Sequence, residues 1–216
     1  MIEAIVFDMD GVLVDARDWH YQALNRALET VGHHIERHDH LVRFDGLPTA
    51  TKLDMLSADR GLPRDLHAFI CERKQAYTME ILLARCAPGF GHEDALSRLR
   101  AMNYKLAVAT NSTRQTLDVV MQMTRLGIYM QAMVSASEVT SPKPDPEIYL
   151  AAFAKLGVAP QACLVVEDND KGVRAARAAR AHVLQVTGCE QVTLENILAR
   201  IEGIEGIDRQ AATALP

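Results

Sequence analysis

Two aspartates one residue apart, Asp8 and Asp10, follow the short apolar run Ala4–Phe7 near the start of the chain. Gly11 comes next, and an Asp-Gly pair between apolar residues is typical of a tight hairpin turn. Two such carboxylates can instead hold a metal ion, and one of them can attack a phosphoryl group. The residues at the ends of the other apolar runs bear on the choice between a turn and a reactive site.

Polar residues also close or follow three of the later apolar runs. They are Thr110, Asn111 and Ser112 at the second run, Lys143 after the third, and Glu167 and Asp168 at the fourth. If the runs are parallel strands, their carboxyl ends meet at one edge of the sheet, where open α/β sheets bind ligands. We therefore expect these residues to lie near Asp8 and Asp10.

Together these residue types suit phosphoryl chemistry. Carboxylates as close as Asp8, Asp10 and Asp168 would repel one another and raise one another's pKa values, a cost that a divalent cation removes. A ligand set made only of oxygen favours a hard ion such as Mg²⁺. Lys143 supplies a positive charge for phosphoryl oxygens, and the hydroxyl of Thr110 or Ser112 can donate hydrogen bonds to them.

Each motif also has a purely structural explanation. The segment Thr110–Ser112 could cap the helix that follows, and Glu167 with Asp168 could place negative charge at a helix N-terminus. Lys143 could be a surface lysine among prolines. The acidic segments lack the spacing of a calcium-binding EF-hand loop. The combination of motifs favours a metal-dependent phosphoryl site over a bare turn.

The pattern of apolar runs predicts the scaffold that positions these residues. The runs are nearly continuous, as in parallel strands buried on both faces, and helical periodicity separates the later ones. Strands alternating with helices indicate an α/β fold with a doubly wound, Rossmann-like parallel sheet. The predicted strands are Ala4–Phe7, Leu106–Thr110, Ala132–Ser135, Cys163–Glu167 and Val183–Val186.

A helical insertion interrupts this alternation after the first strand. The stretch 15–87 has no convincing buried strand, and its apolar residues recur at helical spacing. We predict that residues 1–14 and 88–216 form an α/β catalytic core around this insertion, with Ala87–Gly91 as the returning linker. The four histidines between 33 and 40 are expected in a solvated loop. The last helix is expected over Leu194–Ile201, followed by a frayed tail.

Composition narrows the classes of partner. The chain has 216 residues, a formal net charge of -5 and a pI of about 5.9, which does not favour nucleic acid or an anionic membrane. No apolar run approaches the length of a membrane span, and the N-terminus lacks the features of a signal peptide. Four widely spaced cysteines without a C-x-x-C pair favour a reduced compartment. We expect a cytoplasmic monomer or weak dimer that acts on a small phosphorylated metabolite.

Four ordered motifs resemble those of the haloacid dehalogenase-like superfamily. The motifs are D-M-D-G-V at Asp8–Val12, T-N-S at Thr110–Ser112, Lys143 within S-P-K-P-D-P, and V-V-E-D-N-D-K-G at Val165–Gly172. The insertion after the first motif is similar to the helical cap domain of phosphoglycolate-type phosphatases and β-phosphoglucomutase. The P-x-P-x-x-[YF] continuation at Pro144–Tyr149 also resembles that subgroup.

The resemblance implies a role for each aspartate and for its partners. Asp8 would be the nucleophile and a metal ligand. Asp10 would be the general acid and base, with its backbone carbonyl on the metal. Asp168 would ligate Mg²⁺, with Glu167 as a further ligand or as the support of one, and Lys143 would stabilise Asp8 and the phosphoryl charge. Dehalogenases of the superfamily lack the second aspartate, so Asp10 favours phosphoryl transfer.

The resemblance extends to the residues that hold substrate. Asn111, with Thr110 or Ser112, would bind phosphoryl oxygens. In the insertion, His20 stands where mutase-like members carry a histidine that assists the acid and base. Thr49 stands about where such members carry an arginine for a second phosphate.

Two lysines of the insertion could replace that arginine. Lys52 or Lys74 would supply the missing positive charge. The alternative for both lysines is a solvated position, and for His20 a packed one.

These observations lead to ranked hypotheses. The first is a Mg²⁺-dependent phosphatase that hydrolyses a small phosphomonoester, such as a sugar phosphate, through an aspartyl-phosphate. The alternative within enzymes is a phosphomutase of the β-phosphoglucomutase type. A phospho-receiver domain would also combine aspartates, Thr or Ser and Lys with Mg²⁺, but it predicts no cap and an adjacent acidic pair. A binding protein on a decayed scaffold is the last alternative, and the intact set of reactive residues counts against it.

Overall fold

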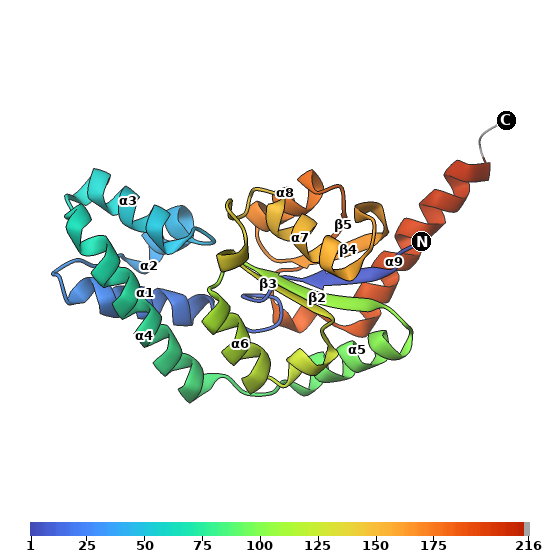
Figure 1. Ribbon diagram of the computed structural model, residues 1–216, viewed down its shortest axis with the longest axis horizontal. Helices are drawn as coiled ribbons and strands as arrows, with labels where there is room; N and C mark the ends of the chain where they lie inside the picture. The colour runs from blue at the N-terminus through green and yellow to red at the C-terminus, as the bar shows by residue number, and fades with distance from the viewer. Residues whose placement is uncertain (214–216) are drawn as a thin grey trace. The chain divides into compact units, whose positions relative to one another are not determined.

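The computed structural model describes residues 1–213, with side chains described up to residue 206 (Figure 1). The chain divides into two compact units. The larger unit comprises Met1–Asp15 and the chain from Ala87 onward, and the smaller unit comprises Ala16–Cys86. The reactive residues of the four motifs all belong to the larger unit.

A five-stranded sheet forms the centre of the larger unit. Its order is β3-β2-β1-β4-β5, and every neighbouring pair of strands is parallel. This confirms the predicted α/β fold with a parallel sheet. Three strands have the predicted bounds, and β2 and β5 each begin one residue earlier than expected. The strands are β1 (Ala4–Phe7), β2 (Lys105–Thr110), β3 (Ala132–Ser135), β4 (Cys163–Glu167) and β5 (His182–Gln185).

The register brings the carboxyl ends of the central strands to one edge of the sheet, with β2 and β4 extending one or two residues beyond β1. Phe7, the last residue of β1, pairs with Val108 of β2 on one side and with Val166 of β4 on the other. Because all strands run in the same direction, the residues that follow them gather at one edge. The first strand lies between β2 and β4, so Asp8 leaves the sheet between their carboxyl ends.

Helices cover both faces of this sheet, with α7 and α8 on one face and α5, α6 and α9 on the other (Figure 1). The first face packs the small side chains of β1 and β2 against α7, which contributes Tyr149 and Phe153 to the buried core. The main helices are α5 (Phe90–Ala101), α6 (Arg114–Met123), α7 (Glu147–Leu156), α8 (Asp170–Ala178) and α9 (Leu194–Thr213). The short ones are η3 (Leu126–Tyr129), η4 (Ala136–Glu138), η5 (Pro160–Ala162) and η6 (Cys189–Gln191).

The smaller unit is helical and has a hydrophobic core of its own. Leu24 and Leu28 pack there with Phe44, Leu53 and Leu56. Gly61 follows the last residue of the helix α3 and caps it, with a φ of 69°, a left-handed conformation that favours glycine. The helical elements are α1 (Arg17–Glu29), α2 (Arg37–Asp39), the π-helix η1 (His40–Phe44), α3 (Thr49–Arg60), η2 (Arg64–Leu66) and α4 (His67–Arg85).

Three local expectations were wrong. The last helix does not end at Ile201 but runs to Thr213, because Ile204 continues the buried stripe of Ile197 and Ile201. The predicted linker is shorter than expected, since α5 begins at Phe90. His40 is not solvated: it starts η1 and is 3% exposed.

No helix among the described residues is long and apolar enough to cross a membrane.

Burial of His40 predicts that the stability of the smaller unit depends on pH. Burial, reinforced by the positive charge of Lys52, lowers the pKa of His40 from 6.5 to about 4. Between these two pH values the unfolded chain binds more protons than the folded chain, so stability falls as the pH falls. The loss due to His40 should reach about 3 kcal/mol between pH 7 and pH 4.

The single tryptophan, Trp19, lies in α1, so its fluorescence during urea unfolding reports on this unit. His40→Gln should remove most of the pH dependence between pH 7 and pH 4. The same substitution at the exposed His38 is the control and should leave it unchanged. Equal slopes in the two variants would contradict the prediction.

Candidate active site

Asp8 and Asp10 lie in a tight turn that begins where β1 ends. The backbone N–H of Asp8 still donates to the carbonyl of Val166 on β4, at 3.0 Å. The chain then turns at Gly11, which has a φ of 87° and donates its N–H to the carbonyl of Val14 at 2.7 Å. A turn and a reactive site are therefore not alternatives, because the turn holds both carboxylates at the edge of the sheet.

Lys143 is buried beside Asp8. Its ammonium donates to Oδ1 of Asp8 at 2.7 Å, to Oε1 of Glu167 at 2.7 Å and to the carbonyl of Ala109 at 2.9 Å. These contacts use all three donors of the ammonium. Burial disfavours the ammonium, but Asp8 and Glu167 raise the pKa of Lys143 above its ordinary value, so the side chain stays charged. The structural alternative, a surface lysine among prolines, is therefore ruled out, since Lys143 is buried.

The loop that carries Lys143 is held at two places. The backbone N–H of Lys143 donates to Oδ1 of Asn111 at 3.1 Å. The carboxylate of Glu147, in the first turn of α7, accepts hydrogen bonds from the backbone N–H groups of Thr140 and Ser141 at 2.9 Å and 2.8 Å. Asn111 thus connects the end of β2 to the lysine loop.

Glu167 is fully buried and accepts hydrogen bonds on both oxygens. Besides Lys143, the hydroxyl of Tyr149 donates to Oε1 at 2.5 Å. The backbone N–H of Asp168 donates to Oε2 at 3.0 Å, and Nδ2 of Asn169 donates to it at 3.2 Å. A helix that begins directly after these residues places Gly172 against the same carboxylate.

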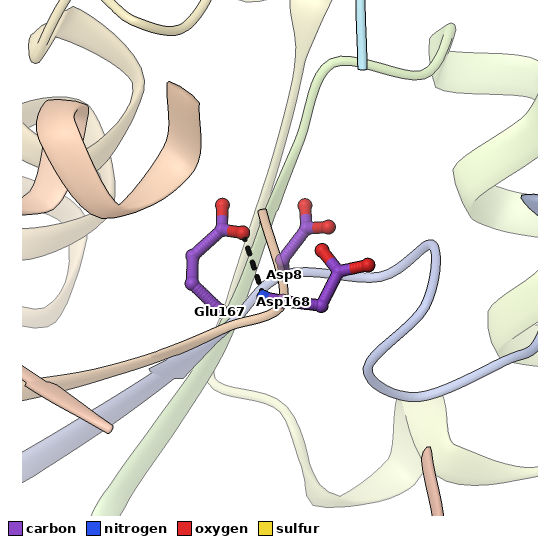
Figure 2. A group of neighbouring side chains, drawn as sticks. All are labelled: Asp8, Glu167 and Asp168. Atoms are coloured by element: carbon purple, nitrogen blue, oxygen red, sulfur yellow. Dashed lines mark hydrogen bonds between the residues drawn. The ribbon is translucent and has the colours of Figure 1, made fainter. Parts of the chain in front are cut away.

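Three carboxylates form an acidic cluster next to Lys143. Asp8, Glu167 and Asp168 each offer an oxygen, and these atoms lie within 4.8 Å of one another (Figure 2). Burial raises the pKa of Asp8 well above its ordinary value, Lys143 lowers it, and Glu167 adds to the rise. One ammonium therefore does not balance the buried negative charge. The cluster fits a divalent cation that prefers oxygen ligands.

The residues 110–112 bind one another and their neighbours. The hydroxyl of Ser112 donates to Oδ2 of Asp10 at 2.7 Å, and the backbone N–H of Ser112 donates to Oγ1 of Thr110 at 3.0 Å. These residues do not cap the following helix, since Thr113 is the N-cap of α6. Ser112 therefore orients Asp10, while Asn111 holds the loop of Lys143.

The predicted substrate residues of the insertion lie in the smaller unit. Nζ of Lys74 on α4 lies 3.3 Å from Nδ1 of His20 on α1, so the structure brings these two together. Lys52 is buried on α3, and Thr49 is the first residue of that helix. The solvated position weighed from sequence is therefore wrong for Lys52.

A model of the haloacid dehalogenase-like hydrolase family matches residues 5–186. This chain belongs to that family. The match spans the turn of Asp8, the lysine loop and the acidic cluster, as well as the whole helical unit. The predicted family and the predicted hydrolase class are thereby confirmed.

Relatives within the family carry names of sugar phosphate enzymes. The chain is 33% identical over 183 residues to a phosphorylated carbohydrates phosphatase of Thermotoga maritima, covering 82% of each chain. It is 29% identical to the fructose-1-phosphate phosphatase YqaB of Escherichia coli, covering 84% of this chain and 95% of the relative. A solved β-phosphoglucomutase of Clostridium difficile superimposes with a TM-score of 0.82 at 23% identity, over 94% of this chain and 98% of that one, which shows the shared fold.

Sequence reasoning missed three residues of this haloacid dehalogenase-like site. Tyr149, Asn169 and Gly172 all contact or border Glu167. Each lay inside a quoted motif, but no charge or spacing distinguished it. The contact of Tyr149 depends on how α7 packs on the sheet, which the local pattern does not reveal.

Gly172 is required by the position of Glu167. A Cβ atom on Gly172 would lie 1.7 Å from Oε1 of Glu167, and five hydrogen bonds hold that carboxylate in place. We expect Gly172→Ala to lower the free energy of unfolding by about 1–3 kcal/mol, as overpacked cores do. Urea unfolding followed by circular dichroism measures the change.

Gly203→Ala is the matched control, because Gly203 is also helical and a Cβ there would meet nothing within 4 Å. This variant should gain about 0.5–1 kcal/mol from better helix propensity. A Gly172→Ala protein as stable as the control would show that Glu167 moves away without cost.

Proposed function

We propose that this chain is a Mg²⁺-dependent phosphatase that hydrolyses small phosphomonoesters, with sugar phosphates as its substrate class. The observation that carries the proposal is the ammonium of Lys143, buried 2.7 Å from Asp8 and beside an acidic cluster. This arrangement would combine a nucleophile with two sources of positive charge for phosphoryl oxygens: the ammonium of Lys143 and a cation that the acidic cluster would hold. The names of the phosphatase relatives support the substrate class.

In the first step, a carboxylate oxygen of Asp8 attacks phosphorus and the bond to the leaving oxygen breaks. Asp10 donates a proton to that oxygen, which departs as an alcohol. The product on the enzyme is an aspartyl-phosphate on Asp8. Lys143, in contact with Asp8, offsets negative charge on the transferring group.

In the second step, Asp10 accepts a proton from water while the water oxygen attacks phosphorus. The bond between Asp8 and phosphorus breaks, inorganic phosphate leaves, and the Asp8 carboxylate is restored. Ser112 keeps its hydroxyl on Asp10 at 2.7 Å, so it orients the carboxyl for both proton transfers. Thr110 and Asn111 complete the strand end that would face phosphoryl oxygens.

The residues that would hold Mg²⁺ are Asp8 and Asp168, with the backbone carbonyl of Asp10 and with Glu167 as a ligand or as support. When bound, the ion neutralises charge on the cluster and on the phosphoryl oxygens. The helical unit 16–86 would select the substrate.

Candidate substrate contacts in that unit are His20, Thr49, Lys52 and Lys74. A phosphomutase fits less well, because Thr49 replaces the arginine expected to hold a second phosphate, and the relatives named above include two phosphatases.

Mg²⁺-dependent phosphate release from p-nitrophenyl phosphate and a panel of sugar phosphates tests the proposal. Asp8→Asn should abolish release, because the amide is not a nucleophile. Asp170→Asn, at an exposed aspartate two residues from Asp168, is the control and should stay active. Turnover that persists without Mg²⁺ or without the Asp8 carboxylate would refute the mechanism. Glucose 1-phosphate that yields an isomerised sugar phosphate in place of free phosphate would favour the mutase.

Asp10→Asn tests the assignment of the acid and base. Loss of the proton donor and acceptor should slow turnover by about 10²–10⁴-fold. With a substrate whose leaving group needs no protonation, such as p-nitrophenyl phosphate, Asp8 should still be phosphorylated and the phosphoenzyme should accumulate. Mass spectrometry of the quenched protein detects it on the peptide that contains Asp8. Full activity in the variant would exclude this role for Asp10.

A further inference from the structure

Both oxygens of the Glu167 carboxylate accept hydrogen bonds from the protein. Lys143 and Tyr149 donate to Oε1, at 2.7 Å and 2.5 Å, and Asp168 N–H and Asn169 Nδ2 donate to Oε2, at 3.0 Å and 3.2 Å. A carboxylate has about four acceptor positions. Donors from the protein hold both oxygens, so Glu167 behaves as a fixed connection between its neighbours.

That connection joins the two halves of the reactive site. Through Oε1, Glu167 holds the ammonium that also contacts Asp8. Through Oε2, it holds the backbone of Asp168, whose own carboxylate belongs to the acidic cluster. A rotation of Glu167 would therefore move Lys143 and release Asp168 together.

Tyr149 limits this rotation from the side of α7. Its side chain is fully buried, and its ring lies 4.7 Å from Nζ of Lys143 and packs near Phe153 on the same helix. Burial, reinforced by the negative charge of Glu167, raises the pKa of Tyr149 well above its ordinary value, so its hydroxyl remains a donor. The carboxylate also lies close to the backbone of Gly172, where a Cβ atom would be 1.7 Å from Oε1.

We propose that Tyr149 is a positioning residue that acts through Glu167 to fix both Lys143 and Asp168. The proposal rests on the proposed function, both for its catalytic consequence and for the cation site that the acidic cluster would form. With the hydroxyl removed, Oε1 loses one of its two donors and Glu167 gains freedom to rotate. Because hydrogen bonds that orient metal ligands typically contribute 10–100-fold to affinity or activity, the site should bind a divalent cation more weakly.

Tyr149→Phe tests this with the smallest change, since the ring over Lys143 and its packing remain. Electron paramagnetic resonance measures the binding of Mn²⁺, used as the probe, without substrate. We expect the Mn²⁺ dissociation constant of the variant to be about tenfold higher than that of the wild type. With saturating Mg²⁺ and p-nitrophenyl phosphate, kcat should fall more than KM changes, because Lys143 acts on charge that develops during the reaction.

Tyr129→Phe is the matched control. The hydroxyl of Tyr129 also donates to a carboxylate, Oε1 of Glu93 at 3.5 Å, but on η3 and outside the acidic cluster. This variant should bind Mn²⁺ like the wild type. Thermal unfolding of both variants shows whether any change reflects a loss of fold.

The outcomes separate the inference from the proposed function. Equal Mn²⁺ dissociation constants for the wild type and Tyr149→Phe overturn the inference, even if the phosphatase assay succeeds. A weaker Mn²⁺ site in Tyr149→Phe supports the positioning role, even if no tested phosphomonoester is hydrolysed. In that last case the phosphatase proposal fails and the structural role of Tyr149 remains.

Discussion

The buried ion pair between Lys143 and the carboxylates of Asp8 and Glu167 is the interaction on which the site depends. Bringing charges out of water costs several kcal/mol per ion, and such pairs rarely repay that cost in stability alone. Here the ammonium makes three hydrogen bonds, so every N–H donor of Lys143 has an acceptor. The arrangement is better explained by reactivity than by stability, because it holds the proposed nucleophile, Asp8, beside a positive charge in a buried place.

The parallel sheet is what makes this ion pair possible. Its three acceptors come from three adjacent strands: Asp8 follows β1, Ala109 lies in β2 and Glu167 ends β4. Phe7 pairs with Val108 and with Val166. The next residues of the three segments, Asp8, Ala109 and Glu167, therefore lie level with one another, and their oxygens converge on one ammonium. The lysine itself arrives on a loop, which Asn111 and Glu147 hold through backbone N–H groups. The strands therefore fix the carboxylates, and loop contacts fix the cation.

The hydrophobic pattern of the sequence predicted the strands well, because the residues of a buried strand show its burial directly. Buried parallel strands need continuous apolar runs, so β1, β3 and β4 could be read residue by residue, and their polar ends identified Asp8 and Glu167. His40 was misjudged because its polar neighbours suggested solvent, whereas the packing of η1 buries it. Tyr149 was missed for a related reason: the contact with Glu167 joins α7 to β4 through tertiary packing, and no spacing in the sequence encodes it.

The same turn gives two nearby aspartates different surroundings, and this difference favours separate roles. Asp8 is buried beside the ammonium of Lys143 and two other acidic residues. One ammonium does not balance these carboxylates, so a second cation would stabilise the Asp8 carboxylate. Asp10 is only partly buried, and its neighbour is the hydroxyl of Ser112, a neutral donor. A carboxylate beside an ammonium is suited to attack as an anion, while a hydroxyl donor such as Ser112 can orient a carboxyl that gains and loses a proton. The turn at Gly11 creates both environments within three residues.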